Sequence, residues 1–158
     1  MQNLSELLDV GCMQLEMKAR QKFEAIEELV QLLLDCGKIS DKERFIKELL
    51  ERENLSSTGI GQGIAIPHRL TAGVDKTHIA FGRKVKGVPF ESVDQKPAHI
   101  IFLILGPQGQ HSEHLRILSS LSRYLHDRAF FEALMRAQSP LEIVQLIKSK
   151  EESTHFPA

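Results

Sequence analysis

Three side chains of this 158-residue sequence, His68, His114 and Arg52, combine the chemistry and the setting needed to handle a phosphoryl group. A neutral imidazole nitrogen is a nucleophile near neutral pH, because the unperturbed pKa of histidine is about 6.5. His68 follows Ile66-Pro67, and the fixed φ of proline stiffens the backbone that carries the histidine. The sequence predicts His68 as a nucleophile at the end of a short buried strand. For a lone histidine, an ordinary turn or surface position is the alternative.

His114 and Arg52 could stabilise a phosphoryl group rather than accept it. His114 falls in the first turn of an expected helix, where free N–H groups and the helix dipole attract anions. Arg52 lies near the end of another expected helix, and its planar guanidinium suits phosphoryl oxygens. Taken alone, Arg52 is better explained as a solvated cation at a helix end or as a salt-bridge partner. His111 and His114 could also form a metal pair, but no third ligand has convincing spacing.

Gly59, Gly61 and Gly63 precede the candidate nucleophile. They form no P-loop, because no Gly-Lys-Ser/Thr follows, and their spacing is not that of a dinucleotide-binding fingerprint. A tight loop leading into a strand is the simplest interpretation. If His68 carries a phosphoryl group, these glycines would let the backbone run close to it and leave room for a partner's active residue.

Two helices are expected before the glycine stretch. Hydrophobic periodicity predicts the first over about residues 18–35, with Phe23 on its apolar face. The capping-box pattern Ser40-Asp41-Lys42-Glu43 opens the second, which ends near Asn54.

Three helices are expected near the end of the chain. One begins near Ser112 with Leu115, Leu118, Leu121 and Leu125 facing inward, and Asp127 caps the next. The last runs from 140 to about 147, after Ser139 as its cap.

Strands are expected between these helices. The candidates are residues 64–66, 77–85 and, less regularly, 88–90, while 98–105 is expected to be a strand buried on both faces. The order of elements predicts an α/β fold: a single-domain sandwich with a mixed sheet of about five strands, flanked by helix pairs. The pattern does not reveal the order of strands in the sheet.

Composition narrows the function class. A formal net charge of −1 argues against a nucleic-acid binder, and the longest apolar run, residues 100–105, is too short for insertion into a membrane. The N-terminal MQNLSELLDV lacks the features of a signal peptide, so a cytoplasmic location is expected. Cys12 and Cys36 have no CxxC spacing and are predicted to be reduced rather than joined in a disulfide.

The stretch TGIGQGIAIPH, residues 58–68, resembles the signature of the EIIA type-2 domains of the phosphotransferase system. This is the fructose/mannitol class, which includes the nitrogen-regulatory EIIA proteins. Arg52-Glu53, sixteen residues before the histidine, and Glu113-His114-Leu115 agree with the family pattern. The resemblance covers about residues 3–147. We therefore expect the domain to span 1–150, with 151–158 as a flexible tail.

The resemblance implies a cytoplasmic phosphocarrier that needs no cofactor and no metal. It implies that His68 is phosphorylated, at Nε2, that His114 and Arg52 stabilise the phosphoryl group, and that the glycines support the loop. The implied donor is an HPr-type phosphocarrier, and the implied acceptor is an EIIB domain or a regulatory target protein. Arg69, where glycine often follows the histidine, and the additional His111 depart from the pattern.

Three roles remain open from the sequence. The chain could carry phosphoryl groups for sugar uptake, or it could use the phosphorylated state to regulate nitrogen metabolism or ion transport. The alternative is a non-catalytic binding module with the same fold that acts through protein contacts. The joint presence of the two histidines and the arginine argues against this last role.

Overall fold

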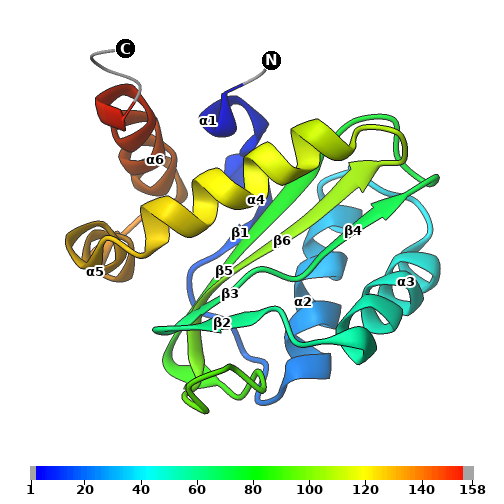
Figure 1. Ribbon diagram of the computed structural model, residues 1–158, viewed down its shortest axis with the longest axis horizontal. Helices are drawn as coiled ribbons and strands as arrows, with labels where there is room; N and C mark the ends of the chain where they lie inside the picture. The colour runs from blue at the N-terminus through cyan, green and yellow to red at the C-terminus, as the bar shows by residue number, and fades with distance from the viewer. Residues whose placement is uncertain (1–2, 155–158) are drawn as a thin grey trace.

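A mixed sheet lies between two layers of helices in the computed structural model, which describes residues 3–154 (Figure 1). The sheet order is β1-β5-β6-β3-β2, and β4 also pairs with β6. The strands are β1 (Met13–Gln14), β2 (Gly59–Gly61), β3 (Ile64–Ala65), β4 (His68–Thr71), β5 (His78–Val88) and β6 (Ala98–Pro107).

The long strands β5 and β6 form the antiparallel centre of the sheet. β1 adds to β5 in parallel, and β2 pairs antiparallel with β3 at the opposite edge. Because these connections join parallel and antiparallel neighbours, the sheet is mixed, as the order of elements predicted.

β3 and β4 are two parts of one interrupted strand. Ile64 pairs in parallel with Ile100 and His68 with Ile104, so the same register continues across the break. Pro67 lies in that break and has no N–H to give to a ladder, yet its carbonyl still accepts a hydrogen bond from the Ile104 amide at 2.9 Å. The sheet therefore has five strand positions, and His68 begins the second part of one strand where the sequence suggested a strand end.

Helices cover both faces of the sheet (Figure 1). Helices α2 and α3 cover one face, and α4, α5 and α6 lie on the other side, together with the short α1. The bounds are α1 (Leu4–Leu7), a 3-10 turn η1 (Val10–Cys12), α2 (Lys22–Asp35), α3 (Lys42–Leu55), α4 (His111–Leu125), α5 (Arg128–Arg136) and α6 (Pro140–Thr154). Of the helices between residues 3 and 154, none has the length and apolar composition that crossing a lipid bilayer requires.

Alternation along β6 divides the interior into two cores. Ile100, Phe102 and Ile104 pack beneath α4 to α6, whereas Ile101 and Leu103 pack against α2 and α3. All five side chains are fully buried, so the prediction of a strand buried on both faces is confirmed.

The predicted start of the first long helix is wrong by about four residues. α2 begins at Lys22 rather than near residue 18. The backbone amides of Lys18 and Ala19 donate to the Glu28 carboxylate instead of continuing the helix, so the chain before Lys22 is held in a loop.

Two predicted helix faces also need correction. Phe23, expected to face the core, is 45% exposed, and Leu115 is 65% exposed. The inner face of α4 includes residues such as His114 and Ile117, which periodicity in leucine alone did not identify. The helix is therefore turned so that the candidate site residue His114 points into the protein.

Capping side chains begin several helices: the predicted Asp127 cap of α5 is confirmed, and α3 and α6 are capped in the same way. The cap of α3 is Asp41 rather than the Ser40 of the predicted capping box, and the Asp41 carboxylate accepts the Arg44 amide at 3.2 Å. The predicted Ser139 cap is confirmed, since its hydroxyl accepts the Glu142 amide at 3.2 Å. In each case the side chain satisfies an N–H that has no partner within the helix.

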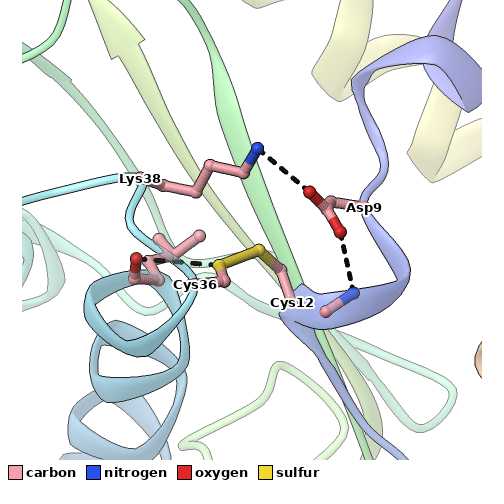
Figure 2. The surroundings of a disulfide bond; sticks show 6 residues. Asp9, Cys12, Cys36 and Lys38 are labelled. Atoms are coloured by element: carbon pink, nitrogen blue, oxygen red, sulfur yellow. Dashed lines mark hydrogen bonds and ion pairs between the residues drawn. A yellow bond between two sulfur atoms is a disulfide. The ribbon is translucent and has the colours of Figure 1, made fainter.

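A disulfide joins Cys12 to Cys36, and the expectation of two reduced thiols is wrong for this structure (Figure 2). The 3-10 turn that contains Cys12 packs against the C-terminal end of α2, where Cys36 is the cap residue. This brings their Cα atoms to 6.4 Å although 24 positions separate them in the sequence. An ion pair between Asp9 and Lys38, at 3.0 Å, ties the same two segments together.

The flexible tail expected from residue 151 does not begin there. α6 continues to Thr154, and the Glu151 side chain is buried against α1. Its carboxylate accepts the backbone amides of Leu4, at 2.5 Å, and Ser5, at 2.8 Å, which satisfies two free donors at the start of α1. Residues 155–158 of the expected tail lie outside the described residues.

Candidate active site

His68 is held in one orientation by its own backbone. Its Nδ1 lies 2.7 Å from the carbonyl oxygen of Ile66, two residues earlier. A carbonyl can only accept, so Nδ1 carries the proton and donates, and Nε2 keeps its lone pair. The ring is half-buried at the start of β4. This geometry presents Nε2 as the nucleophilic atom.

The structure brings His114 to His68. The two ring centroids lie 5.4 Å apart, with the ring planes tilted by 53°. His114 comes from the first turn of α4, and it packs so closely on β6 that a Cβ added to Gly106 would meet its Nδ1 at 2.8 Å. Neither ring nitrogen of this buried side chain has a hydrogen-bond partner among the described residues.

Both histidines are kept neutral at neutral pH. Burial lowers the pKa of His68, and the Arg52 charge lowers it further, against the opposing effects of the Ile66 hydrogen bond and the Glu53 charge. Burial, followed by the charges of His68 and His111, lowers the pKa of His114 to about 4. A neutral His68 can attack phosphorus, and a neutral His114 can donate one N–H to a phosphoryl oxygen.

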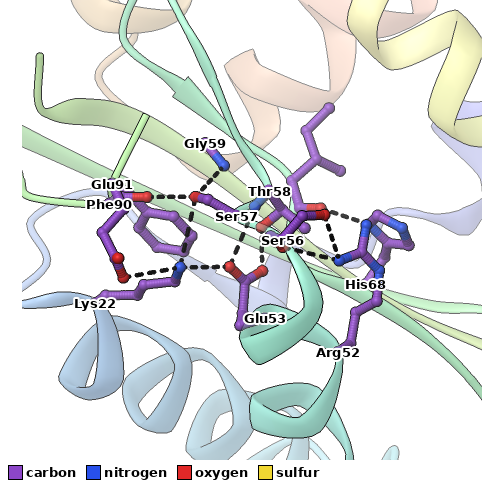
Figure 3. A network of polar contacts seen from close by, with 11 residues as sticks. Lys22, Arg52, Glu53, Ser56, Ser57, Thr58, Gly59, His68, Phe90 and Glu91 are labelled. Atoms are coloured by element: carbon purple, nitrogen blue, oxygen red, sulfur yellow. Dashed lines mark hydrogen bonds and ion pairs between the residues drawn. The ribbon is translucent and has the colours of Figure 1, made fainter. Parts of the chain in front are cut away.

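Arg52 lies beside this pair, in the last turn of α3. Its Nη1 donates to the Ser56 carbonyl at 2.9 Å, which holds the guanidinium over the helix end (Figure 3). Its effect on the pKa of His68 shows that its charge reaches the candidate nucleophile. The three residues predicted from the sequence therefore gather from β4, α3 and α4.

The three glycines shape the β2–β3 hairpin, which precedes His68 in the chain. Gly61 and Gly63 have positive φ values of 89° and 85°, which the turn between β2 and β3 requires. Gly59 lies so close to the loop between β5 and β6 that an added Cβ would clash with the Ser92 hydroxyl. All three glycines contact other side chains or backbone of the fold. Their role is to shape the two short strands that precede His68.

The two departures from the family pattern lie at the margin of the site. Arg69 alternates to the other face of the sheet, where its Nη1 donates to the Glu48 carbonyl of α3 at 3.1 Å. His111 is exposed at the first position of α4 and acts on the site through its charge on His114. Within residues 3–154, no group of three or more His, Cys, Asp or Glu side chains is arranged to hold a metal ion.

Sequence reasoning missed the polar network behind the site. Glu53 is 6% exposed and binds Lys22, from α2, and Thr58. The only signal in the sequence was the position of Glu53 beside Arg52, which the family pattern explains without giving it a role.

The chain thus combines a mixed sheet between two layers of helices with two histidines and an arginine gathered at the start of a strand. The chain belongs to the family described as "Phosphoenolpyruvate-dependent sugar phosphotransferase system, EIIA 2", whose model matches residues 6–150.

The proteins similar to this chain include two fructose-specific relatives and one solved nitrogen-regulatory structure. It is 39% identical over 148 residues to the fructose-specific EIIABC component of Bacillus subtilis, covering 94% of this chain but 23% of that protein. It is also 39% identical over 137 residues to the fructose-specific EIIA component of Haloferax volcanii, covering 87% of this chain and 89% of the relative. The crystal structure of the nitrogen regulatory protein IIA-Ntr from Neisseria meningitidis superposes with a TM-score of 0.85 at 34% identity, covering 91% and 98% of the two chains.

Proposed function

We propose that this chain is a phosphocarrier in which Nε2 of His68 accepts a phosphoryl group from the phosphohistidine of an HPr-type protein. The donor's P–N bond breaks as the bond from phosphorus to Nε2 forms. The departing donor imidazole takes a proton from solvent and leaves neutral, while the phosphorylated His68 ring keeps its Nδ1 proton and its positive charge is balanced by the negative phosphoryl oxygens. The observation that carries this proposal is the 2.7 Å hydrogen bond from Nδ1 to the Ile66 carbonyl, which leaves Nε2 as the acceptor atom beside His114.

His114 and Arg52 stabilise the group during transfer. Phosphoryl transfer between two imidazoles depends on positioning and on stabilising the charge of the phosphoryl oxygens. Because the pKa of His114 is lowered to about 4, this ring donates a hydrogen bond without bringing a second full charge to the site. Arg52 supplies the positive charge from the end of α3.

Exposed apolar side chains next to these residues suit a protein partner. Leu55, three positions after Arg52, is 81% exposed, and Leu115 follows His114 directly. Exposed leucines of this kind can be covered when a carrier or acceptor domain docks. The acceptor in sugar uptake would be the cysteine thiolate of an EIIB domain, which takes the phosphoryl group as the P–Nε2 bond breaks.

Relatives of both physiological kinds support the proposal. The fructose-specific proteins favour sugar transport, whereas the IIA-Ntr structure favours a regulatory use of the phosphorylated state. Both uses require the same acceptance step at His68.

Phosphorylation with purified components tests the proposal. Enzyme I, an HPr-type protein and labelled phosphoenolpyruvate should add one acid-labile phosphoryl group per chain. The His68→Ala variant should accept none, and His126→Ala, which removes an exposed histidine of α4's C-terminal cap, should accept a full equivalent. A full equivalent on His68→Ala would reject the assignment, and no labelling of the wild-type chain would favour the non-catalytic binding module.

The supporting residues are tested by rate. Arg52→Ala and His114→Ala should each slow phosphorylation by about a hundredfold, the usual cost of one preorganised donor. Circular dichroism of the same variants should report an unchanged fold. Unaltered rates would make both residues structural only.

A further inference from the structure

We infer that Glu53 is the positioning residue of this site: its carboxylate takes the Thr58 backbone N–H out of the β-ladder, and this frees the Ile66 carbonyl to hold the His68 ring. The inference rests on the proposed function, because it concerns the presentation of the acceptor nitrogen. Glu53 touches neither His68 nor a phosphoryl group and acts through two intervening residues.

Glu53 is bound from two sides in the interior (Figure 3). One carboxylate oxygen lies 2.7 Å from Lys22 Nζ and accepts the Thr58 amide at 3.1 Å, and the other accepts the Thr58 hydroxyl. A buried carboxylate is stable only with such compensation, so the cation from α2 and the two donors belong together.

The hydrogen bonds of Thr58 and Ile66 show what this network does. The two residues continue the antiparallel pairing of β2 with β3, and the Ile66 amide donates to the Thr58 carbonyl at 3.0 Å. In a regular pair of this kind the reciprocal bond, from the Thr58 amide to the Ile66 carbonyl, is also made. Here the Thr58 amide turns to Glu53, and the Ile66 carbonyl accepts His68 Nδ1 instead.

The surroundings of Lys22 fix the other end of the network. Its Nζ lies 3.4 Å from Glu91 Oε1 and 5.2 Å from the centroid of the Phe90 ring. The Phe90 carbonyl in turn accepts the Ser57 hydroxyl at 2.6 Å. The segment between α3 and β2 is thus anchored at Ser57, directly before Thr58, which helps to hold the Thr58 amide in place for Glu53.

A positioning role predicts a change in the His68 ring itself. The Ile66 hydrogen bond favours the tautomer with the proton on Nδ1, and both this bond and the Glu53 charge raise the pKa of His68. Loss of the Glu53 charge should therefore lower the pKa of His68 and increase the tautomer protonated at Nε2, which cannot accept a phosphoryl group.

The experiment compares Glu53→Gln with Glu51→Gln in the full chain. The first substitution keeps the shape of the side chain and removes its charge, whereas Glu51 is exposed on the same helix and serves as the matched control. Nitrogen-15 NMR of the unphosphorylated protein gives the tautomer and pKa of His68, and rapid-quench phosphorylation by an HPr-type donor gives the rate. We expect Glu53→Gln to shift both NMR readouts and to slow transfer by about tenfold to a hundredfold, with Glu51→Gln unchanged.

A second variant covers the case in which Glu53→Gln does not fold. Thr58→Val keeps the backbone amide and the side-chain shape but removes the hydroxyl that donates to Glu53, so it should shift the tautomer in the same direction by a smaller amount. A wild-type tautomer, pKa and rate in the folded variants would overturn the inference. If His68 proved not to be phosphorylated at all, the proposed function would fail, while the NMR readouts would still decide whether Glu53 positions the ring.

Discussion

Acidification should destabilise this protein through His114. The side chain is 6% exposed, and burial is the main reason that its pKa falls from the ordinary 6.5 to about 4. Between these two values the unfolded chain binds a proton on His114 that the folded chain does not, so stability falls as the pH falls from 6.5 toward 4. A shift of about 2.5 units, at 1.36 kcal/mol per unit, amounts to about 3 kcal/mol. This is a large part of a typical free energy of unfolding of about 5–15 kcal/mol.

Urea denaturation of the wild type and His114→Gln at pH 7.5 and pH 4 measures this contribution. The pKa values of His68 and His78 are also lowered by burial, so both proteins should lose stability in acid. The wild type should lose about 3 kcal/mol more than the variant, because only it retains the buried imidazole. His126→Gln, at an exposed position, should follow the wild type. Equal losses in the wild type and His114→Gln would refute the reasoning that burial keeps this ring neutral.

Three further predictions concern packing, the disulfide and metal. Gly106→Ala should slow phosphorylation by at least about tenfold and lower the free energy of unfolding by about 1–3 kcal/mol, because the new Cβ displaces the His114 ring. Wild-type phosphorylation kinetics in this variant would show that the site tolerates the displacement. The disulfide between Cys12 and Cys36, 24 positions apart, should raise the free energy of unfolding by about 3 kcal/mol. Equal denaturation midpoints with and without a thiol reductant would contradict this. Phosphotransfer should survive a strong chelator, and elemental analysis should find no stoichiometric metal; one zinc per chain, with transfer lost on chelation, would overturn the mechanism.

The larger elements of the fold could be predicted because their patterns are long. β6 and the helices from α2 to α6 were each identified from apolar periodicity and capping residues. β1 and β2 are too short to show a hydrophobic period. They form because they hydrogen-bond to the edges of β5 and β3. β4 was not predicted because a proline such as Pro67 normally ends a strand. Here the residues before and after Pro67 pair with β6 in the same register.

The candidate site residues could be predicted from the sequence, but the residues that hold them in place could not. His68, His114 and Arg52 have side chains whose type and setting make them candidates for phosphoryl chemistry, and the structure brings them together. The role of Glu53 depends on the Thr58 amide and the Ile66 carbonyl, which are neighbours only in the folded protein, so no sequence pattern predicts it. The disulfide escaped prediction for the same reason, since the proximity of the two cysteines is created by the packing of a turn on a helix end.

The contact between Glu151 and the first turn of α1 brings the two ends of the described chain to one corner of the molecule. Figure 1 shows α1 and the end of α6 there, on the side of the sheet that α4 covers, and Leu7 at the end of α1 lines a shared hollow with His111 and Glu113 of α4. A partner domain tethered to either end would start from the same place, on the side of the sheet where His68 meets His114. Its effective concentration at His68 would then be governed by the length and stiffness of the linker, and hardly by which end carries it.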